Sequence, residues 1–326
     1  MANDGISGGM LKWAEYTLLL VLIALAGVLL PEFDYLAYVF MPLPVMFMTI
    51  RYDLKYGLIG LGSSVLVLLY TFQPFQPDIA LPLLQYGTLG IVLGLFFKKL
   101  ESSGRILVYI MLTAVGLAVA ASGTAYLING ENPLVLSSEE SQALSRQWSA
   151  MNERMRIIDE EEMINAASGD GAEPFQYLTE VFQYYLPAYE VVAAAVTAAF
   201  TYVLAIFLLG RYGYKVQPGP AFSEIHLPWY SIWALIIGLG LLLLGDSFNV
   251  TTAKIGKNIL FILSNLYFIM GISVFVHYFK KTKVSLLFKI LVTFTLLICY
   301  PISCICLVVI GAIDPLADFR RLTALK

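Results

Sequence analysis

Residues 184–209 read YYLPAYEVVAAAVTAAFTYVLAIFLL, and Glu190 is the one charged residue in this run. A helix rises about 1.5 Å per residue, so about 20 mostly apolar residues cross the hydrocarbon core of a bilayer. The run is long enough and apolar enough to do so. We therefore predict a transmembrane helix here, and the same reasoning extends along the chain in both directions.

Eight other runs have a similar character. They cover residues 11–30, 35–50, 56–72, 79–97, 106–128, 227–245, 258–279 and 286–312. The run 35–50 is short and contains Pro42 and Pro44, so we expect a broken or re-entrant helix that other protein segments shield. The sequence predicts an all-α polytopic transmembrane helical bundle of eight to nine spans, forming a single membrane domain over residues 1–326.

The composition agrees with a chain that faces lipid. Hydrophobic residues make up 59% of the chain and charged residues 13%, whereas soluble domains carry about 25% charged residues. The lipid bilayer is therefore the expected environment. The net charge of −3 gives no basic face for nucleic acid. Three cysteines lie together in one apolar run, which favours neither a disulfide framework nor a metal site, and we expect no cofactor.

Lys and Arg near the ends of the spans predict the orientation, because cytoplasmic loops carry an excess of both. With a cytoplasmic N-terminus, one side collects twelve of these residues, among them Arg51, Lys98, Arg211 and Lys280. This bias indicates a cytoplasmic N-terminus, and we expect the chain to lie in a bacterial cytoplasmic (inner) membrane. Nine spans would place the C-terminus outside, which the basic tail at Arg320 and Arg321 argues against.

Residues 129–183, between the fifth and sixth spans, form the one large extramembrane piece. Ser137 and Glu140 fit a capping box, which marks the start of a helix. An apolar stripe with helical spacing follows, made of Leu144, Trp148, Met151, Met155 and Ile158. We predict an extracytoplasmic helical insert that either packs on the bundle or acts as a lid or docking helix. In the second case Trp148, Met151 and Met155 would contact a membrane-protein partner.

Glu190 is the first candidate for a ligand-binding residue. Ionisable groups inside a membrane are costly and mark functional sites. Glu190 lies about six residues inside its span, roughly 9 Å along the helix. It would either hold a small-molecule ligand or a proton in an outward-facing cavity with Tyr189, or reach back to water or to a neighbouring helix.

Three further polar side chains lie within spans. Asn265 lies in the middle of its span, and Gln85 and Tyr86 lie within the fourth. A buried amide or phenol needs a hydrogen-bond partner, so each of these three side chains either joins two helices or contacts a ligand. No nucleophile elbow, zinc-protease helix or phosphate-binding loop is present, and we predict that the chain is not an enzyme.

Several segments together resemble a known family. They are Pro42-Leu43-Pro44 with Arg51-Tyr52, Leu186-Pro187 with Leu209-Gly210-Arg211, Leu227-Pro228-Trp229, Asn258 with Gly271, and Gly311-Ala312-Ile313-Asp314 with Asp318-Phe319-Arg320. Their order resembles the YybS-like family of bacterial membrane proteins, a domain-of-unknown-function family. The resemblance covers roughly Leu11 to Arg321 and implies a membrane protein without known catalytic residues.

The N-terminal half is also similar to the substrate-binding S components of energy-coupling-factor transporters and to the rod-shape protein MreD. The shared feature is a proline-bearing segment followed by a Gly-rich span, here Pro42 to Gly62. S components often present an Ala-x-x-x-Ala surface on their first span, and here that span has only Ala24 and Ala26. The resemblance to S components implies small-solute binding or transport. The MreD resemblance implies an envelope scaffold or assembly factor that acts through protein contacts.

Overall fold

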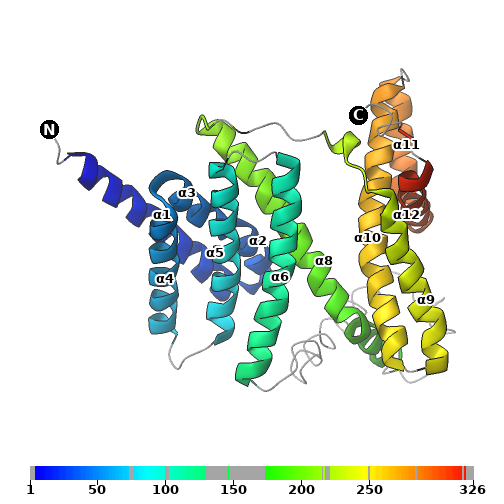
Figure 1. Ribbon diagram of the computed structural model, residues 1–326, viewed down its shortest axis with the longest axis horizontal. Helices are drawn as coiled ribbons and strands as arrows, with labels where there is room; N and C mark the ends of the chain where they lie inside the picture. Colours follow the sequence, from blue (N-terminus) through cyan, green and yellow to red (C-terminus); the bar gives the residue numbers. More distant parts are fainter. Residues whose placement is uncertain are drawn as a thin grey trace.

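The computed structural model describes residues 4–72, 77–99, 103–129, 173–214, 221–248, 250–282, 285–317 and 319–320, together with residues 146 and 216. Every regular element within these ranges is a helix (Figure 1). The predicted all-α fold is therefore confirmed for the described part of the chain. Trp148, Met151, Met155 and the capping box at Ser137 lie outside the described residues.

The first half of the chain builds one group of helices. Its elements are α1 (Asp4–Leu29), η1 (Pro31–Phe33), α2 (Asp34–Phe40), α3 (Pro42–Tyr52), α4 (Leu54–Thr71), α5 (Pro77–Lys98) and α6 (Ser103–Asn129). The second half contributes α8 (Glu173–Arg211), η2 (Phe222–Glu224), η3 (Trp229–Ser231), α9 (Ile232–Phe248), α10 (Val250–Lys281), α11 (Leu286–Ile298) and α12 (Tyr300–Ala317). Helix α8 slants from the second group to the first (Figure 1).

Six helices among the described residues are long and apolar enough to cross a membrane: α4, α5, α6, α8, α10 and α12. Shorter apolar helices cover Trp13–Leu29, Trp229–Gly245 and Leu286–Ile298. Large apolar side chains point outward on these helices, with Leu66 69% and Leu243 76% exposed. Such surface is stable against acyl chains and costly against water. The architecture is therefore that of a membrane-embedded helical bundle.

The segment 35–50 is a broken helix, as its prolines predicted. Helix α2 ends at Phe40 and α3 begins at Pro42, with Met41 between them. Proline suits the first position of a helix because its missing N–H has no intrahelical partner there. The break divides the return path of the chain into two short helices.

Helices α2 and α3 together run back along the whole apolar length of α1. The indole Nε1 of Trp13 donates to the carbonyl of Tyr56 at 3.1 Å. Tyr16 stacks on Phe47 with ring centroids 5.9 Å apart. The end of α3 therefore lies beside the start of α1. We refer to the two ends of the bundle as the Arg51 end and the Asp34 end.

Small residues bring α3 close to α4 and α5. A Cβ added at Gly90 of α5 would lie 2.3 Å from the carbonyl oxygen of Pro42, and one at Gly57 of α4 would lie 2.4 Å from Thr49 Oγ1. Helix backbones in lipid pack closely where side chains are this small. Gly62 and Gly116 differ, because nothing lies within 4 Å of the corresponding position.

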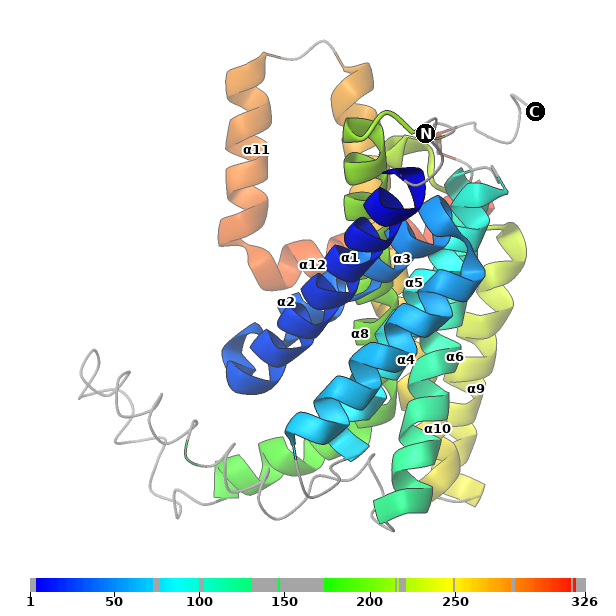
Figure 2. The ribbon, with the colours of Figure 1, turned by 90° about the vertical axis from the view of Figure 1, so that its left-hand side faces the viewer.

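The run 286–312 was predicted as one helix, and this prediction was wrong. Helix α11 ends at Ile298, Cys299 adopts a non-helical conformation, and α12 begins at Tyr300. Pro301 supplies the reason, since its ring excludes the backbone N–H that a continuous helix needs. Figure 2 shows the sharp turn between the two helices.

The turn at Cys299 determines where residue 319 lies. Helix α12 packs against α10, where a Cβ at Gly311 would lie 1.9 Å from the Tyr267 carbonyl oxygen. Beyond α12, the Phe319 carbonyl accepts a hydrogen bond of 2.9 Å from the Tyr278 hydroxyl. Residue 319 therefore lies beside the last turns of α10, at the Arg51 end. Nine complete spans would instead place residue 319 at the Asp34 end, so the described helices do not follow a nine-span path.

A buried ion pair holds this end of α12. The guanidinium of Arg320 donates to Asp314 Oδ2 at 2.6 Å, to Ser273 Oγ at 2.8 Å and to the Ser223 carbonyl at 3.1 Å. Arg320 and Asp314 are each 4% exposed. The three bonds join α12, α10 and η2, because a buried charge must find polar partners.

An exposed ion pair joins the α3–α4 turn to α5 at the Arg51 end. Asp53 has φ of 116°, a backbone conformation that L-residues rarely adopt. Its carboxylate accepts a hydrogen bond from Lys98 at the end of α5. This bond and the charge of Lys98 lower the pKa of the Asp53 carboxyl below its ordinary value of 3.8. The ion pair thus fixes a strained turn.

Candidate functional site

A polar cavity of about 450 Å³ opens at the Asp34 end, between α2, α5, α6 and α8. Its polar lining residues are Asp34, Tyr35, Tyr38, Gln85, Tyr86, Ser122, Tyr189, Glu190 and Thr197. Four of the five predicted ligand-binding residues therefore meet in one place: Gln85 and Tyr86 from α5, and Tyr189 and Glu190 from α8. Volumes of this size are typical of small-molecule sites.

Each helix brings its polar residues to the cavity by ordinary helical spacing. Residues four apart lie on one face, so Glu190, Ala194 and the nearby Thr197 point to the same side of α8. Thr201 of α8 donates to the Val39 carbonyl at 3.0 Å and so holds α2 against α8. Because alanine and threonine line this face of α8, there is room for the tyrosines of α2.

Tyrosine rings form the wall of the cavity. Tyr38 donates to Asp34 Oδ2 at 2.5 Å and stacks on Tyr86, with centroids 4.7 Å apart and planes 13° from parallel. The hydroxyls of Tyr35 and Tyr189 share a hydrogen bond. These contacts fix four rings drawn from three helices, so the wall is organised before any ligand arrives.

Glu190 differs from Asp34 in its partners. Within the part of the chain that the structure describes, the Glu190 carboxylate has no hydrogen bond and no ion pair. None of the residues that line the cavity is a Lys, Arg or His. Both carboxylates lie near enough to Tyr35 and Tyr86 to interact with each hydroxyl through space. Among the described residues, the cavity therefore combines two acidic groups with aromatic rings and has no basic side chain in its lining.

Asn265 does not belong to the cavity. Its Nδ2 donates to the Phe261 carbonyl at 2.9 Å, one turn back on its own helix α10, and it is absent from the residues lining the pocket. The hydropathy pattern placed Asn265 deep in the span, but depth alone does not tell which way a side chain points. The interhelical bond that we considered for Asn265 is made by a different amide, that of Asn258.

Asn258 bridges α10 to the proline kink of α8, and sequence reasoning did not assign it a role. Its Oδ1 accepts from the Ala188 backbone N–H at 3.0 Å, and its Nδ2 donates to the Tyr184 carbonyl at 3.0 Å. An uninterrupted helix pairs these two groups, four residues apart, with each other. Pro187 lies between them, and a proline in a membrane helix needs such outside partners. Pro187, a proline inside a span, was the sequence signal that a neighbouring helix must supply such partners.

The Asn258 bridge lies directly beside the cavity. Ala188, one of its two partners, precedes Tyr189 and Glu190 on α8. Lys254 and Lys257 lie over the ring of Tyr184, 5.5 and 4.8 Å from its centroid, outside the cavity lining. Helix α10 thus positions α8 directly before Tyr189 and Glu190, the two residues that α8 first contributes to the cavity.

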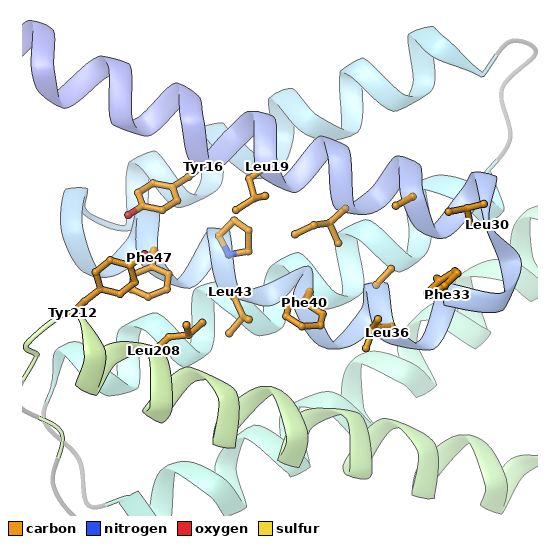
Figure 3. Close-up of a pocket in the computed structure, with 14 residues that line it drawn as sticks. Tyr16, Leu19, Leu30, Phe33, Leu36, Phe40, Leu43, Phe47, Leu208 and Tyr212 are labelled. Atoms are coloured by element: carbon orange, nitrogen blue, oxygen red, sulfur yellow. The ribbon is translucent and has the colours of Figure 1, made fainter.

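A second pocket, of about 510 Å³, lies between α1, the α2–α3 segment and the end of α8. Figure 3 shows its apolar lining, with Leu19, Phe40, Leu43 and Phe47 around it and Tyr16 and Tyr212 at one end. It lacks the carboxylates and amides that would hold a polar solute. We therefore take the cavity at the Asp34 end as the candidate site.

Metal binding finds no geometric support in the ranges described. No group of three His, Cys, Asp or Glu side chains there is placed to hold a metal ion. Cys299, Cys304 and Cys306 are free thiols near the α11–α12 turn. The chemistry of the site therefore depends on carboxylates, phenols and one amide.

Long apolar helices, outward-facing leucines and a polar cavity near one end define an integral membrane protein. The chain belongs to the family described as Predicted membrane protein (DUF2232), whose profile matches residues 18–315. No curated protein and no solved structure matches the sequence significantly. The family assignment agrees with the membrane class. The finer resemblances to YybS-like proteins, S components and MreD stay expectations.

Proposed function

We propose that this protein binds a small polar solute from the outer side of a bacterial inner membrane, as part of a transport process. The observation that carries the proposal is the convergence of Gln85, Tyr86, Tyr189 and Glu190 on one cavity. Polar groups inside a membrane helix bundle are costly, so they are typically kept for a function, and solute binding is such a function.

The distribution of basic residues supports the orientation. Arg51, Lys98, Arg211 and Lys280 lie at or near helix ends at the Arg51 end, and Arg320 joins them there. The excess of basic residues marks the cytoplasmic side. The cavity then opens outward, and the N-terminus is cytoplasmic. The scaffold alternative depends on Trp148, Met151 and Met155, outside the described residues, and draws no support from the cavity.

The test is a binding screen with a matched pair of variants. Full-length protein in detergent is analysed for co-purifying small molecules and for thermal shifts against a panel of vitamins, amines, sugars and amino acids. Glu190→Gln removes a carboxylate from the cavity, and Glu32→Gln removes an exposed one from η1 at the same end. We expect a solute that stabilises the wild type and Glu32→Gln but not Glu190→Gln. A ligand-free protein with no shift against the whole panel would refute solute binding.

A further inference from the structure

We infer that the solute carries a positively charged nitrogen, so the cavity selects organic cations. This inference rests on the proposed function and names the class of its ligand. It follows from the charges that face the cavity, from the aromatic rings in its wall and from its volume.

The charges favour a cation. Asp34 and Glu190 face the cavity, and none of the described residues that line it is basic. Asp34 already accepts a bond from Tyr38, whereas Glu190 has no partner within the described residues. Closing a ligand over an unpaired carboxylate removes it from water, which is costly unless the ligand supplies the opposite charge. An anionic ligand would meet two like charges, and a neutral one would leave the charge of Glu190 without an opposite charge.

The wall favours the same class. Tyr35, Tyr38, Tyr86 and Tyr189 line the cavity, and the face of a tyrosine ring attracts cations, most strongly where water is excluded. Tyr38 and Tyr86 stack on each other, and both rings belong to the lining of the cavity. Two carboxylates with several aromatic rings form the combination that recognises ammonium groups. The Gln85 amide then supplies one donor and one acceptor to orient the rest of the solute.

The size separates an organic cation from a metal ion. A calcium ion needs six to eight oxygen ligands at about 2.3–2.6 Å, and two carboxylates around about 450 Å³ do not form such a shell. The volume falls in the range of about 300–1,000 Å³ that holds small organic ligands. Lys254 and Lys257, the basic residues over Tyr184, lie outside the lining and do not neutralise the carboxylates.

The experiment compares charged solutes with uncharged isosteres. Full-length protein in lipid nanodiscs is titrated with choline against neohexyl alcohol, its carbon isostere, and with benzylamine against benzyl alcohol, alongside the screening panel. We expect each cation to bind about tenfold or more tightly than its isostere. Glu190→Gln and Asp34→Asn should each reduce this preference about tenfold, because each removes a charge. Glu32→Gln should leave it unchanged.

The outcomes distinguish this inference from solute binding itself. Equal affinity for a cation and its isostere, or a preference that survives both Glu190→Gln and Asp34→Asn, overturns cation selectivity and leaves the proposed function standing. The same holds if only neutral or anionic members of the panel bind. Absence of binding by every solute overturns the proposed function and this inference with it. Intact folding of the variants is verified by their melting temperatures without solute.

Discussion

Replacing Asn258 by leucine tests whether α10 supports the kink of α8. The amide makes two bonds to α8, to the Ala188 N–H and the Tyr184 carbonyl, each 3.0 Å long. An interhelical hydrogen bond in a membrane contributes about 0.6 kcal/mol on average and up to about 1.7. A buried backbone group left without a partner costs about 1–3 kcal/mol. We therefore expect Asn258→Leu to lower the free energy of unfolding by roughly 2–4 kcal/mol.

Asn265→Leu is the matched control, because it is the same substitution on the same helix. The Asn265 amide bonds to the Phe261 carbonyl of α10 itself, so its loss should cost less than about 1 kcal/mol. Stability is measured by SDS titration of the protein in mixed micelles. Equal losses for the two variants would refute the assigned role of Asn258.

Pro187→Ala gives a second arm of the same experiment. Alanine restores a backbone N–H and removes the ring that bends α8, so Ala188 and Tyr184 regain each other as partners. Pro187→Ala should therefore recover much of the stability lost in Asn258→Leu. It should also alter solute affinity, because Glu190 lies three residues beyond the kink. If the double variant is no more stable than Asn258→Leu alone, the kink does not depend on the bridge.

Three further predictions concern the C-terminal helices and the Arg51 end. Arg320→Leu leaves Asp314 buried and unpaired and should cost about 3–5 kcal/mol in SDS titration, whereas Asp314→Leu with Arg320→Leu should lie much nearer the wild type; equal losses would contradict the ion-pair argument. Gly311→Leu should separate α12 from α10 and lower the melting temperature, since its Cβ would lie 1.9 Å from the Tyr267 carbonyl oxygen; Gly116→Leu, with nothing within 4 Å, should not. The lowered pKa of Asp53 means that the Lys98 ion pair stabilises the fold above the unfolded pKa and is lost as pH falls through the lower folded pKa. The melting temperatures of wild type and Asp53→Asn should converge as the pH falls below 3.8, the ordinary pKa of an aspartate carboxyl. A difference that grows on acidification would contradict this prediction.

Hydropathy predicted most of the helices because a helix that faces lipid needs a long run of apolar residues. Long apolar runs with few charges gave α4, α5, α6 and α8 to within a few residues of their apolar cores, whereas the run predicted for α10 began well inside the core Thr252–Lys281. The same signature missed the break at Cys299, since α11, the turn and α12 are all apolar. Pro301 was the local sign of a break, because it lacks the backbone N–H that a continuous helix needs.

The sequence predicted which residue types belong to the site, but not which way each side chain points. Glu190 and Gln85 stood out because polar groups are rare inside spans. Asp34 was missed because it lies between two predicted spans, and Tyr35 and Tyr38 were missed because tyrosines near the end of a span are typical of a membrane interface. Asn258 and Asn265 are separated by seven residues, about two turns of helix. Only the packing of α10 against α8 shows which of the two bonds to another helix.

The α11–α12 turn has a consequence for how the chain enters the membrane. Between Lys289 and Arg320 the described residues include one acidic side chain, Asp314, and no basic one. Because α11 starts after the last turn of α10 and residue 319 lies beside Tyr278, both ends of this segment lie at the Arg51 end. Insertion of α11 and α12 from that end would carry no described lysine or arginine across the bilayer. Partitioning of their apolar side chains into lipid would then favour the insertion.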